Sequence, residues 1–355
     1  MSGITDLDIE SDLVEQVAAL SSTGAPAVIC GNGSKHFYGE SVTGHSIQVA
    51  AHSGIIDYDP AELVITLKAG CRLKEVNKLL AENGQMFGFE APGFTSEATL
   101  GGVLAAGLAG PRRAYAGAIR DFVLGVKMIN GRAEVQQFGG RVIKNVAGFD
   151  LSRLLVGSLG TLGIILEASV KVIPMPEKEL TLEFEHVDPD SHINWVNRIA
   201  GKPYPISASC WVDGRSLLRL SGSEQGVGEI RQQLGGDSTD FDWQTVAEQT
   251  HAFFKDEAPL TRISLPPTTS GQFTDQAQLV EWGGAQRWLC GEVDLEALRQ
   301  QVEPIGGQVT AFRNHAAGVA CFHPPGSAVF ALQRRIKSSF DPAGILNPGR
   351  IYPGL

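Results

Sequence analysis

The sequence is poor in cysteine and holds no metal-binding arrangement of it. Its cysteines, Cys30, Cys71, Cys210, Cys290 and Cys321, are odd in number and widely spaced, with no CxxC pair. This pattern excludes a disulfide framework, and no zinc site or iron–sulfur cluster is expected within the chain. The eight histidines are scattered too, so we expect no metal. Unpaired cysteines are typical of a reducing compartment, and we expect a cytoplasmic protein.

Positive charge and long apolar runs are also scarce. Lys and Arg number 29 against 39 Asp and Glu, giving a formal net charge of −10. Such a chain offers no basic surface for nucleic acid or an anionic bilayer. The most apolar run, at 100–110, is shorter than the roughly 18 residues that span a membrane. The acidic first residues do not resemble a signal peptide, so any membrane association is expected to be indirect.

Glycine, by contrast, is abundant and unevenly placed. It makes up 42 of 355 residues, and 16 of these lie between Gly84 and Gly163. All five tryptophans lie beyond residue 190. The proline-marked segment at 172–178 separates the two halves. We therefore predict two domains, at 1–176 and 177–355, with the tail at 340–355 returning to the first.

Hydrophobic periodicity gives a coarse picture of each half. The first half mixes helical spacing with short strands, and the second predicts an α+β domain with an antiparallel sheet. We expect a hairpin with a type I′ turn at Asn130–Gly131 and a second hairpin at Asp213–Gly214.

Three glycine clusters, at 31–37, 91–113 and 156–165, stand at strand ends or helix starts. Glycine lets main-chain N–H groups approach a ligand closely, and successive N–H groups can form a nest for a diphosphate. Tight turns or close packing would account for such clusters about as well as diphosphate binding does. A nicotinamide Rossmann motif fails because His36 stands where GxGxxG needs its third glycine, and no Walker loop is present near Lys35.

Four longer motifs carry a resemblance to a known family. They are GNGSK, TLGGVLAAGLAGPRR, VIKNVAGFDLSRLLVGSLGTLGII and the terminal FDPAGILNPGRIYP. Together they resemble the vanillyl-alcohol oxidase superfamily of flavoproteins, which have a PCMH-type FAD domain. RDFVLG, RISLPP and WGGAQRWL are similar to the FAD-binding E subunits of bacterial glycolate oxidase. The resemblance implies an α+β protein with a two-part FAD-binding domain, followed by a smaller domain like the C-terminal domain of FAD-linked oxidases.

The resemblance also implies which residues bind FAD. Some of these residues are expected to hold the diphosphate and ribityl chain, and others to pass near the flavin, to meet the adenine or to close the site. They are Gly31, Asn32, Gly33, Ser34, Lys35, Pro92, Gly93, Thr99, Gly101, Gly102, Gly107, Gly110, Gly160, Gly163, Ile164 and Asn347, with 348–350 beside the last. Some relatives attach the flavin to a histidine in the first loop. A covalent bond to His36 is thus conceivable, but a non-covalent FAD is the expectation.

The implied activity is the oxidation of glycolate to glyoxylate by a complex. A second flavoprotein subunit would carry the hydroxy-acid site, and an iron–sulfur subunit would pass electrons toward quinone at the cytoplasmic face of the inner membrane. Arg112, Arg113 and Lys144 could orient a carboxylate, although structural ion pairs are the commoner use of such cations. No catalytic base can be named. Leu159 stands where relatives that act directly on 2-hydroxy acids commonly carry an acidic residue.

Three alternatives remain open on the sequence. The main one is a stand-alone flavin oxidase or dehydrogenase of a small 2-hydroxy acid, alcohol or sugar acid. The second is a scaffold that has lost its flavin. A nicotinamide dehydrogenase is the third, although the glycine spacing that its motif requires is not present.

Overall fold

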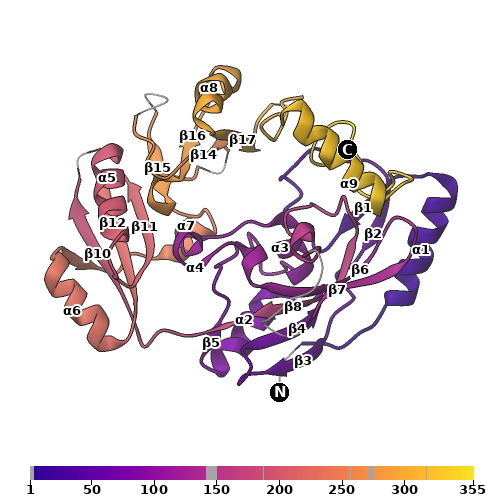
Figure 1. Cartoon of the computed structure of the whole chain (residues 1–355), viewed down its shortest axis with the longest axis horizontal. Coiled ribbons are helices and arrows are strands. Elements are labelled where there is room, and N and C mark those ends of the chain that lie inside the picture. The colour runs from indigo at the N-terminus through magenta and orange to yellow at the C-terminus, as the bar shows by residue number, and fades with distance from the viewer. Residues whose placement is uncertain (1–3, 141–149, 187, 256, 272–275, 317) are drawn as a thin grey trace. The chain divides into compact units, whose positions relative to one another are not determined.

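The computed structural model describes residues 4–140, 150–186, 188–255, 257–271, 276–316 and 318–355 (Figure 1). The chain divides into two compact units. Unit 1 comprises Met1–Leu108, Ala118–Met175 and Pro324–Leu355, and unit 2 comprises Ala109–Gly117 and Pro176–His323. The chain thus leaves unit 1 next to residue 176 and re-enters it before the tail. No helix in the described ranges is both long and apolar enough to cross a bilayer.

Unit 1 is built on a five-stranded antiparallel sheet. Its strands, in spatial order, are β3 (Ile55–Asp59), β4 (Val64–Lys68), β8 (Ile164–Lys171), β6 (Val123–Ile129) and β7 (Val135–Gly139). Strand β8 is central and almost wholly buried, in keeping with its apolar sequence IILEASVK. It begins at Ile164, within the end of the third glycine cluster, so that cluster leads into the core of the unit.

Two short strand pairs and several helices complete unit 1. The pairs are β1 (Ala27–Cys30) with β2 (His45–Gln48), which are parallel, and β5 (Gln85–Met86) with β9 (Ile173–Pro174), which are antiparallel. The helices are α1 (Glu10–Thr23), α2 (Leu73–Glu82), α3 (Leu100–Ala106), α9 (Ser327–Phe340) and the short η1 (Ile119–Asp121) and η2 (Arg153–Leu155). Leu346 bridges Ala27 in parallel, so the C-terminal tail extends the small β1–β2 sheet.

Unit 2 contains an eight-stranded antiparallel sheet, as the sequence predicts for the second half. In spatial order its strands are β13 (Asp237–Thr239), β10 (Lys178–Glu185), β12 (Arg215–Gly222), β11 (Ile206–Val212), β15 (Gln278–Glu281), β16 (Gln286–Cys290), β14 (Leu260–Ser264) and β17 (Gln308–Arg313). Its helices are α4 (Arg113–Ala116), α5 (Pro189–Ala200), α6 (Glu224–Leu234), α7 (Trp243–Ala247), α8 (Leu295–Val302), η3 (Trp282–Gly284) and η4 (Glu303–Ile305).

The nine residues Ala109–Gly117 belong to unit 2, although the flanking chain on both sides belongs to unit 1. Trp282 Nε1 donates to the Gly110 carbonyl at 3.1 Å, and Tyr115 donates to Ser209 Oγ at 3.0 Å. Arg112 forms an ion pair with Glu179 within the same unit. The sequence pattern did not indicate that 109–117 belongs to unit 2, because the segment continues an apolar glycine-rich run.

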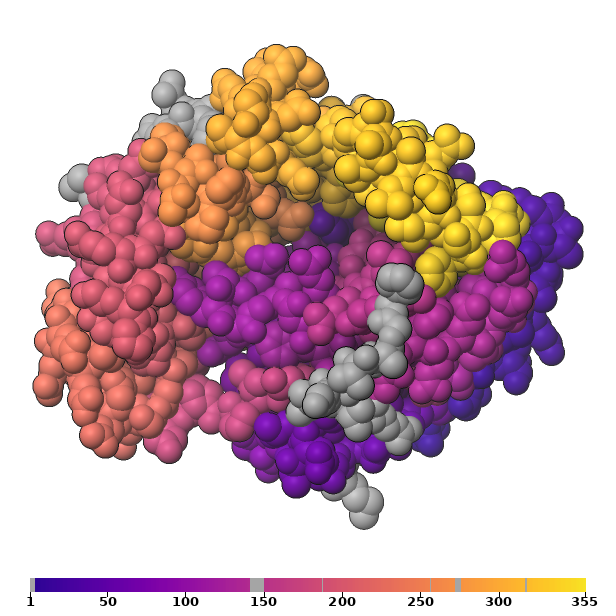
Figure 2. All heavy atoms as spheres, viewed as in Figure 1, coloured from indigo at the N-terminus to yellow at the C-terminus, as the bar shows by residue number. Residues whose placement is uncertain are grey.

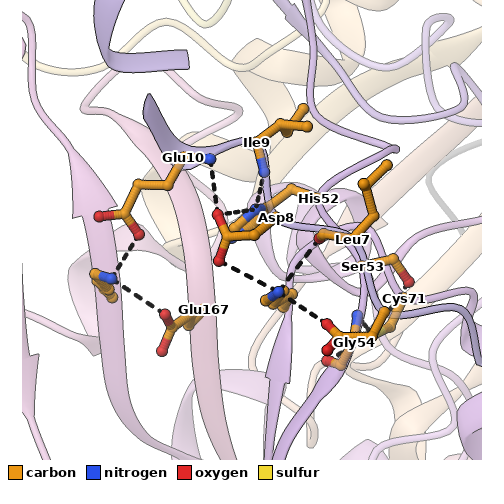
Figure 3. A network of polar contacts seen from close by, with 12 residues as sticks. Leu7, Asp8, Ile9, Glu10, His52, Ser53, Gly54, Cys71 and Glu167 are labelled. Carbon is orange, nitrogen blue, oxygen red and sulfur yellow. Dashed lines mark hydrogen bonds and ion pairs between the residues drawn. The ribbon is translucent and has the colours of Figure 1, made fainter. Parts of the chain in front are cut away.

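One buried lysine, Lys68, and one half-buried lysine, Lys127, attach the N-terminal segment to the unit 1 sheet. Figure 3 shows their acidic partners Asp8, Glu10 and Glu167. Lys68 Nζ, at the end of β4, lies 2.9 Å from Asp6 Oδ1 and 3.3 Å from Asp8 Oδ2. Lys127 of β6 lies between Glu10 of α1 and Glu167 of β8. These pairs hold the N-terminal segment and the start of α1 to the inner strands β4, β6 and β8.

The two predicted hairpins have different outcomes. Asp213 and Gly214 form a two-residue turn between β11 and β12 with φ of 52° and 78°, which confirms the prediction. The β6–β7 hairpin exists, but the prediction of a type I′ turn at Asn130–Gly131 is wrong. Asn130 Oδ1 instead accepts the N–H groups of Arg132 and Glu134, which lengthens the loop and puts the positive φ at Ala133.

Replacing Gly214 with alanine should destabilise unit 2 by about 1 kcal/mol, because a Cβ is strained at this left-handed φ. All five tryptophans lie in unit 2, so denaturant unfolding followed by tryptophan fluorescence reports on that unit. The matched control is Gly228→Ala in α6, where a Cβ meets nothing within 4 Å. It should stabilise by roughly 0.5–1 kcal/mol. Equal shifts in both variants would contradict the turn assignment.

Candidate cofactor site

Two adjoining pockets lie within unit 1. One encloses about 620 Å³ and the other about 450 Å³ of empty space, including space open to solvent. They share the lining residues Ile29, Gly31, Thr99, Gly102, Ala105, Leu159 and Asn347. We call the two together the joined pocket.

The first wall is the close approach of the end of β1 to the start of α3. A Cβ on Gly31 would lie 2.4 Å from Thr99 Oγ1, so only glycine fits there. Thr99 caps α3 by accepting the Gly102 N–H with its side chain at 3.3 Å. The first and second glycine clusters therefore meet, as a shared ligand site requires.

The second wall is built from the loop before β8 and the C-terminal tail. Asn347 Nδ2 donates to the Leu159 carbonyl at 2.7 Å, and Asn347 Oδ1 accepts the Ile29 N–H at 2.8 Å. The side chain is buried, and a Cβ on Gly160 would lie 2.7 Å from its Nδ2. Asn347 thus connects three segments that are far apart in the sequence.

The polar lining of the joined pocket is suited to an anion. Lys35 and Arg350 line it, and no Asp or Glu occurs among its lining residues within the described chain. Arg350 donates to the carbonyls of His36 and Tyr38 at 2.9 and 2.8 Å, which holds its guanidinium beside the first loop. In a protein of net charge −10, the described lining of this pocket thus contains cationic side chains and no carboxylate.

Cys30 and His36 lie together at one end of the pocket. Cys30 Sγ and His36 Nε2 are 3.3 Å apart. Burial raises the pKa of the Cys30 thiol, against the opposing effect of the Gly33 N–H, so the thiol is uncharged at neutral pH. His36 lines the pocket, and the expectation that FAD is bound non-covalently stays a prediction.

Most of the expected site residues come together. The predicted residues that line the joined pocket are Gly31, Asn32, Gly33, Ser34, Lys35, Thr99, Gly101, Gly102, Gly160, Gly163, Ile164 and Asn347. Pro92, Gly93, Gly107 and Gly110 do not line it. The Gly93 carbonyl accepts from Lys35 Nζ at 3.3 Å, and Gly107 ends α3 with a positive φ. Gly110 belongs to unit 2.

The cations proposed to orient a carboxylate have other roles or lie outside the described residues. Arg112 is buried in its pair with Glu179, and the Arg113 guanidinium stacks 4.4 Å from the centre of the Trp282 ring. Both residues lie in unit 2. Lys144 falls in 141–149, outside the described residues.

Several lining residues carried no sequence signal. Ile29, Cys30, Val49, Ala69 and Ala105 come from short strands, loops and a helix whose pocket-facing side no periodicity reveals. One further group, Asp8, Glu10 and His52, brings possible metal ligands within 4.8 Å of one another. Its carboxylates already pair with Lys68 and Lys127, so they serve to attach the N-terminal segment.

Comparison with known proteins bears on this site. A family model described as FAD binding domain matches residues 6–139, and one described as FAD linked oxidases, C-terminal domain matches 325–351. The chain is 40% identical to glycolate oxidase subunit GlcE of Escherichia coli over 99% of this chain and 100% of that protein. It is 35% identical to glycolate oxidase subunit GlcD of Bacillus subtilis over 38% of this chain and 29% of the relative.

A solved alkyldihydroxyacetonephosphate synthase has the same fold. Its TM-score is 0.69 at 14% identity, over 95% of this chain and 75% of that one. This likeness confirms the predicted fold class. Apart from 109–117, both segments matched by the family models belong to unit 1, which also contains the joined pocket.

Gly102→Leu tests whether the joined pocket holds FAD. A Cβ on Gly102 would meet only Thr99 Oγ1, at 3.2 Å, and the residue lines both parts of the pocket. The leucine should therefore occupy ligand space and weaken FAD binding at least about tenfold, measured by titrating apoprotein with FAD. The apoprotein should keep its melting temperature.

Gly228→Leu is the matched control, since it places the same side chain on an exposed helix of unit 2. It should bind FAD as the unmodified chain does. Unchanged FAD affinity in Gly102→Leu would place the cofactor elsewhere.

Proposed function

The chain belongs to the FAD-linked oxidases that include glycolate oxidase subunit GlcE, and from this premise we propose that it is the FAD-bearing subunit of a glycolate-oxidising complex. The full-length match to that subunit is the observation that carries the proposal. The cofactor is FAD, and the chain is an oxidoreductase of the class that acts on CH–OH groups.

The joined pocket supplies what FAD binding requires. When bound, FAD contributes two-electron redox chemistry, and the protein's task is to hold and orient it. Lys35 and Arg350 would neutralise the diphosphate, and the glycine-lined walls would let the ligand approach the backbone. Asn347 would keep the loop at 158–161 against β1.

The same lining argues for a relay of electrons. Proton abstraction from a substrate hydroxyl needs a base within hydrogen-bond reach, and a carboxylate is a common choice. Leu159 lines both parts of the pocket, at the position where direct hydroxy-acid dehydrogenases commonly have an acidic residue. We therefore assign glycolate oxidation to a second flavoprotein subunit resembling GlcD.

The remaining steps of the proposal concern partners. The described residues include five cysteines, none in a disulfide, and no cluster-binding set, so electrons would leave through an iron–sulfur subunit toward quinone. The complex would lie at the cytoplasmic face of the membrane, held there by its partners. This chain would then act as an electron relay between two redox centres.

An anaerobic visible spectrum of the isolated, FAD-loaded chain tests the relay. Glycolate should leave the flavin band at about 450 nm unchanged, because no carboxylate base lines the pocket among the described residues, whereas dithionite should bleach it. The same chain co-purified with its two partner subunits should be bleached by glycolate. Bleaching of the isolated chain by glycolate or D-lactate would instead establish a stand-alone dehydrogenase.

A further inference from the structure

Helix α9 is held to unit 1 by a buried lysine. All residues of α9 are described, and Lys337 is the one among them that is buried. Val329 and Leu332 are 53% and 55% exposed, and Figure 2 shows this C-terminal segment as yellow spheres at the surface. An amphipathic helix ordinarily buries its apolar face instead. The buried ammonium therefore requires an explanation.

Each hydrogen of the Lys337 ammonium has an acceptor. Nζ lies 2.7 Å from the Thr161 carbonyl, 2.7 Å from the Leu346 carbonyl and 2.6 Å from Asp341 Oδ2. Asp341 in turn accepts the N–H groups of Ile345 and Leu346, at 3.2 and 2.7 Å. An ammonium has three donors, so the group is fully satisfied.

The two carbonyls stand next to residues of the joined pocket. Thr161 follows Gly160, and Leu346 precedes Asn347. Asn347 spans the same two segments from the pocket side, through its bond to the Leu159 carbonyl. Lys337 and Asn347 therefore fix one separation, that between the loop at 158–161 and the tail at 345–347, from opposite sides.

A buried charge is a costly way to hold a helix in place. Burial lowers the pKa of Lys337, and the Asp341 carboxylate opposes that shift. Replacing a buried ion pair with well-packed apolar residues is often neutral or stabilising, so such pairs are weak evidence for stability. Unlike an apolar side chain, the ammonium forms directional hydrogen bonds, and these fix the positions of its three acceptors.

We propose that Lys337, paired with Asp341, is a positioning residue of the cofactor site, which sets the place of Asn347 and the Leu159–Gly160 backbone on the pocket wall. The inference rests on the proposed placement of FAD in the joined pocket. Lys337 itself does not line that pocket and acts on FAD through Asn347.

A double-mutant cycle on FAD affinity tests this proposal. Lys337→Met, Asn347→Ala and their combination are prepared as apoprotein and titrated with FAD. Each single change should weaken binding about tenfold, a loss typical of residues that orient a ligand's direct contacts. The double variant should be weaker than either single one by far less than the product of the two losses, because both act on the same wall.

Arg334→Met is the matched control, with the same substitution on the exposed face of α9. It should bind FAD with unchanged affinity and leave the visible circular dichroism of the bound flavin unaltered. Lys337→Met should change that dichroism, because the flavin surroundings shift. If Lys337→Met fails to fold, Asp341→Asn, which keeps the size of the side chain, takes its place in the cycle.

The possible results distinguish a failure of this inference from a failure of the proposed function. Independent, multiplicative losses, or a Lys337→Met variant that behaves as Arg334→Met does, would overturn the positioning role while leaving FAD binding intact. An unmodified chain that binds no FAD would overturn the proposed function, and with it the inference. Loss of binding in Lys337→Met with no effect of Asn347→Ala would show that Lys337 acts by another route.

Discussion

The site depends on the return of the C-terminal tail to the first strand of unit 1. Leu346 pairs with Ala27, and the next residue, Asn347, joins Ile29 to the carbonyl of Leu159. One amide side chain thereby links the beginning, middle and end of the unit. A buried amide of this kind specifies position strongly, because an unmatched partner would cost more than the bond contributes. Gly160 gives room for this closure, because a Cβ there would lie 2.7 Å from Asn347 Nδ2.

Local charge in the pocket differs from that of the whole chain. The net charge of −10 is a sum over the whole chain, whereas Lys35 and Arg350 line the joined pocket without any carboxylate among the described lining residues. Cationic side chains in the lining can therefore bind an anionic ligand although the chain as a whole is acidic. This separation explains how an acidic protein can be suited to a diphosphate.

Much of the architecture was predictable where the physics is local. Asp213–Gly214 forms its turn because the two backbone conformations demand such residues, and the resemblance located Gly31, Thr99 and Asn347 on the pocket. Local rules failed at Asn130, whose side chain competes for backbone N–H groups, and at Gly131, where a Cβ would lie 2.3 Å from Asp341 Oδ1. Lys337 was missed since a lysine in an amphipathic pattern normally faces solvent. The packing of 109–117 with unit 2 likewise depends on tertiary contacts, which a local sequence pattern does not reveal.

The order in which the walls are made has a consequence for biosynthesis. A ribosome translates 27–36, 99–106 and 158–165 first, then the whole of 176–323, and only afterwards the residues around Asn347. The joined pocket, where we propose that FAD binds, lacks its C-terminal wall until then. On that placement, cofactor loading follows translation of unit 2, and a chain that ends before Asn347 would retain FAD poorly.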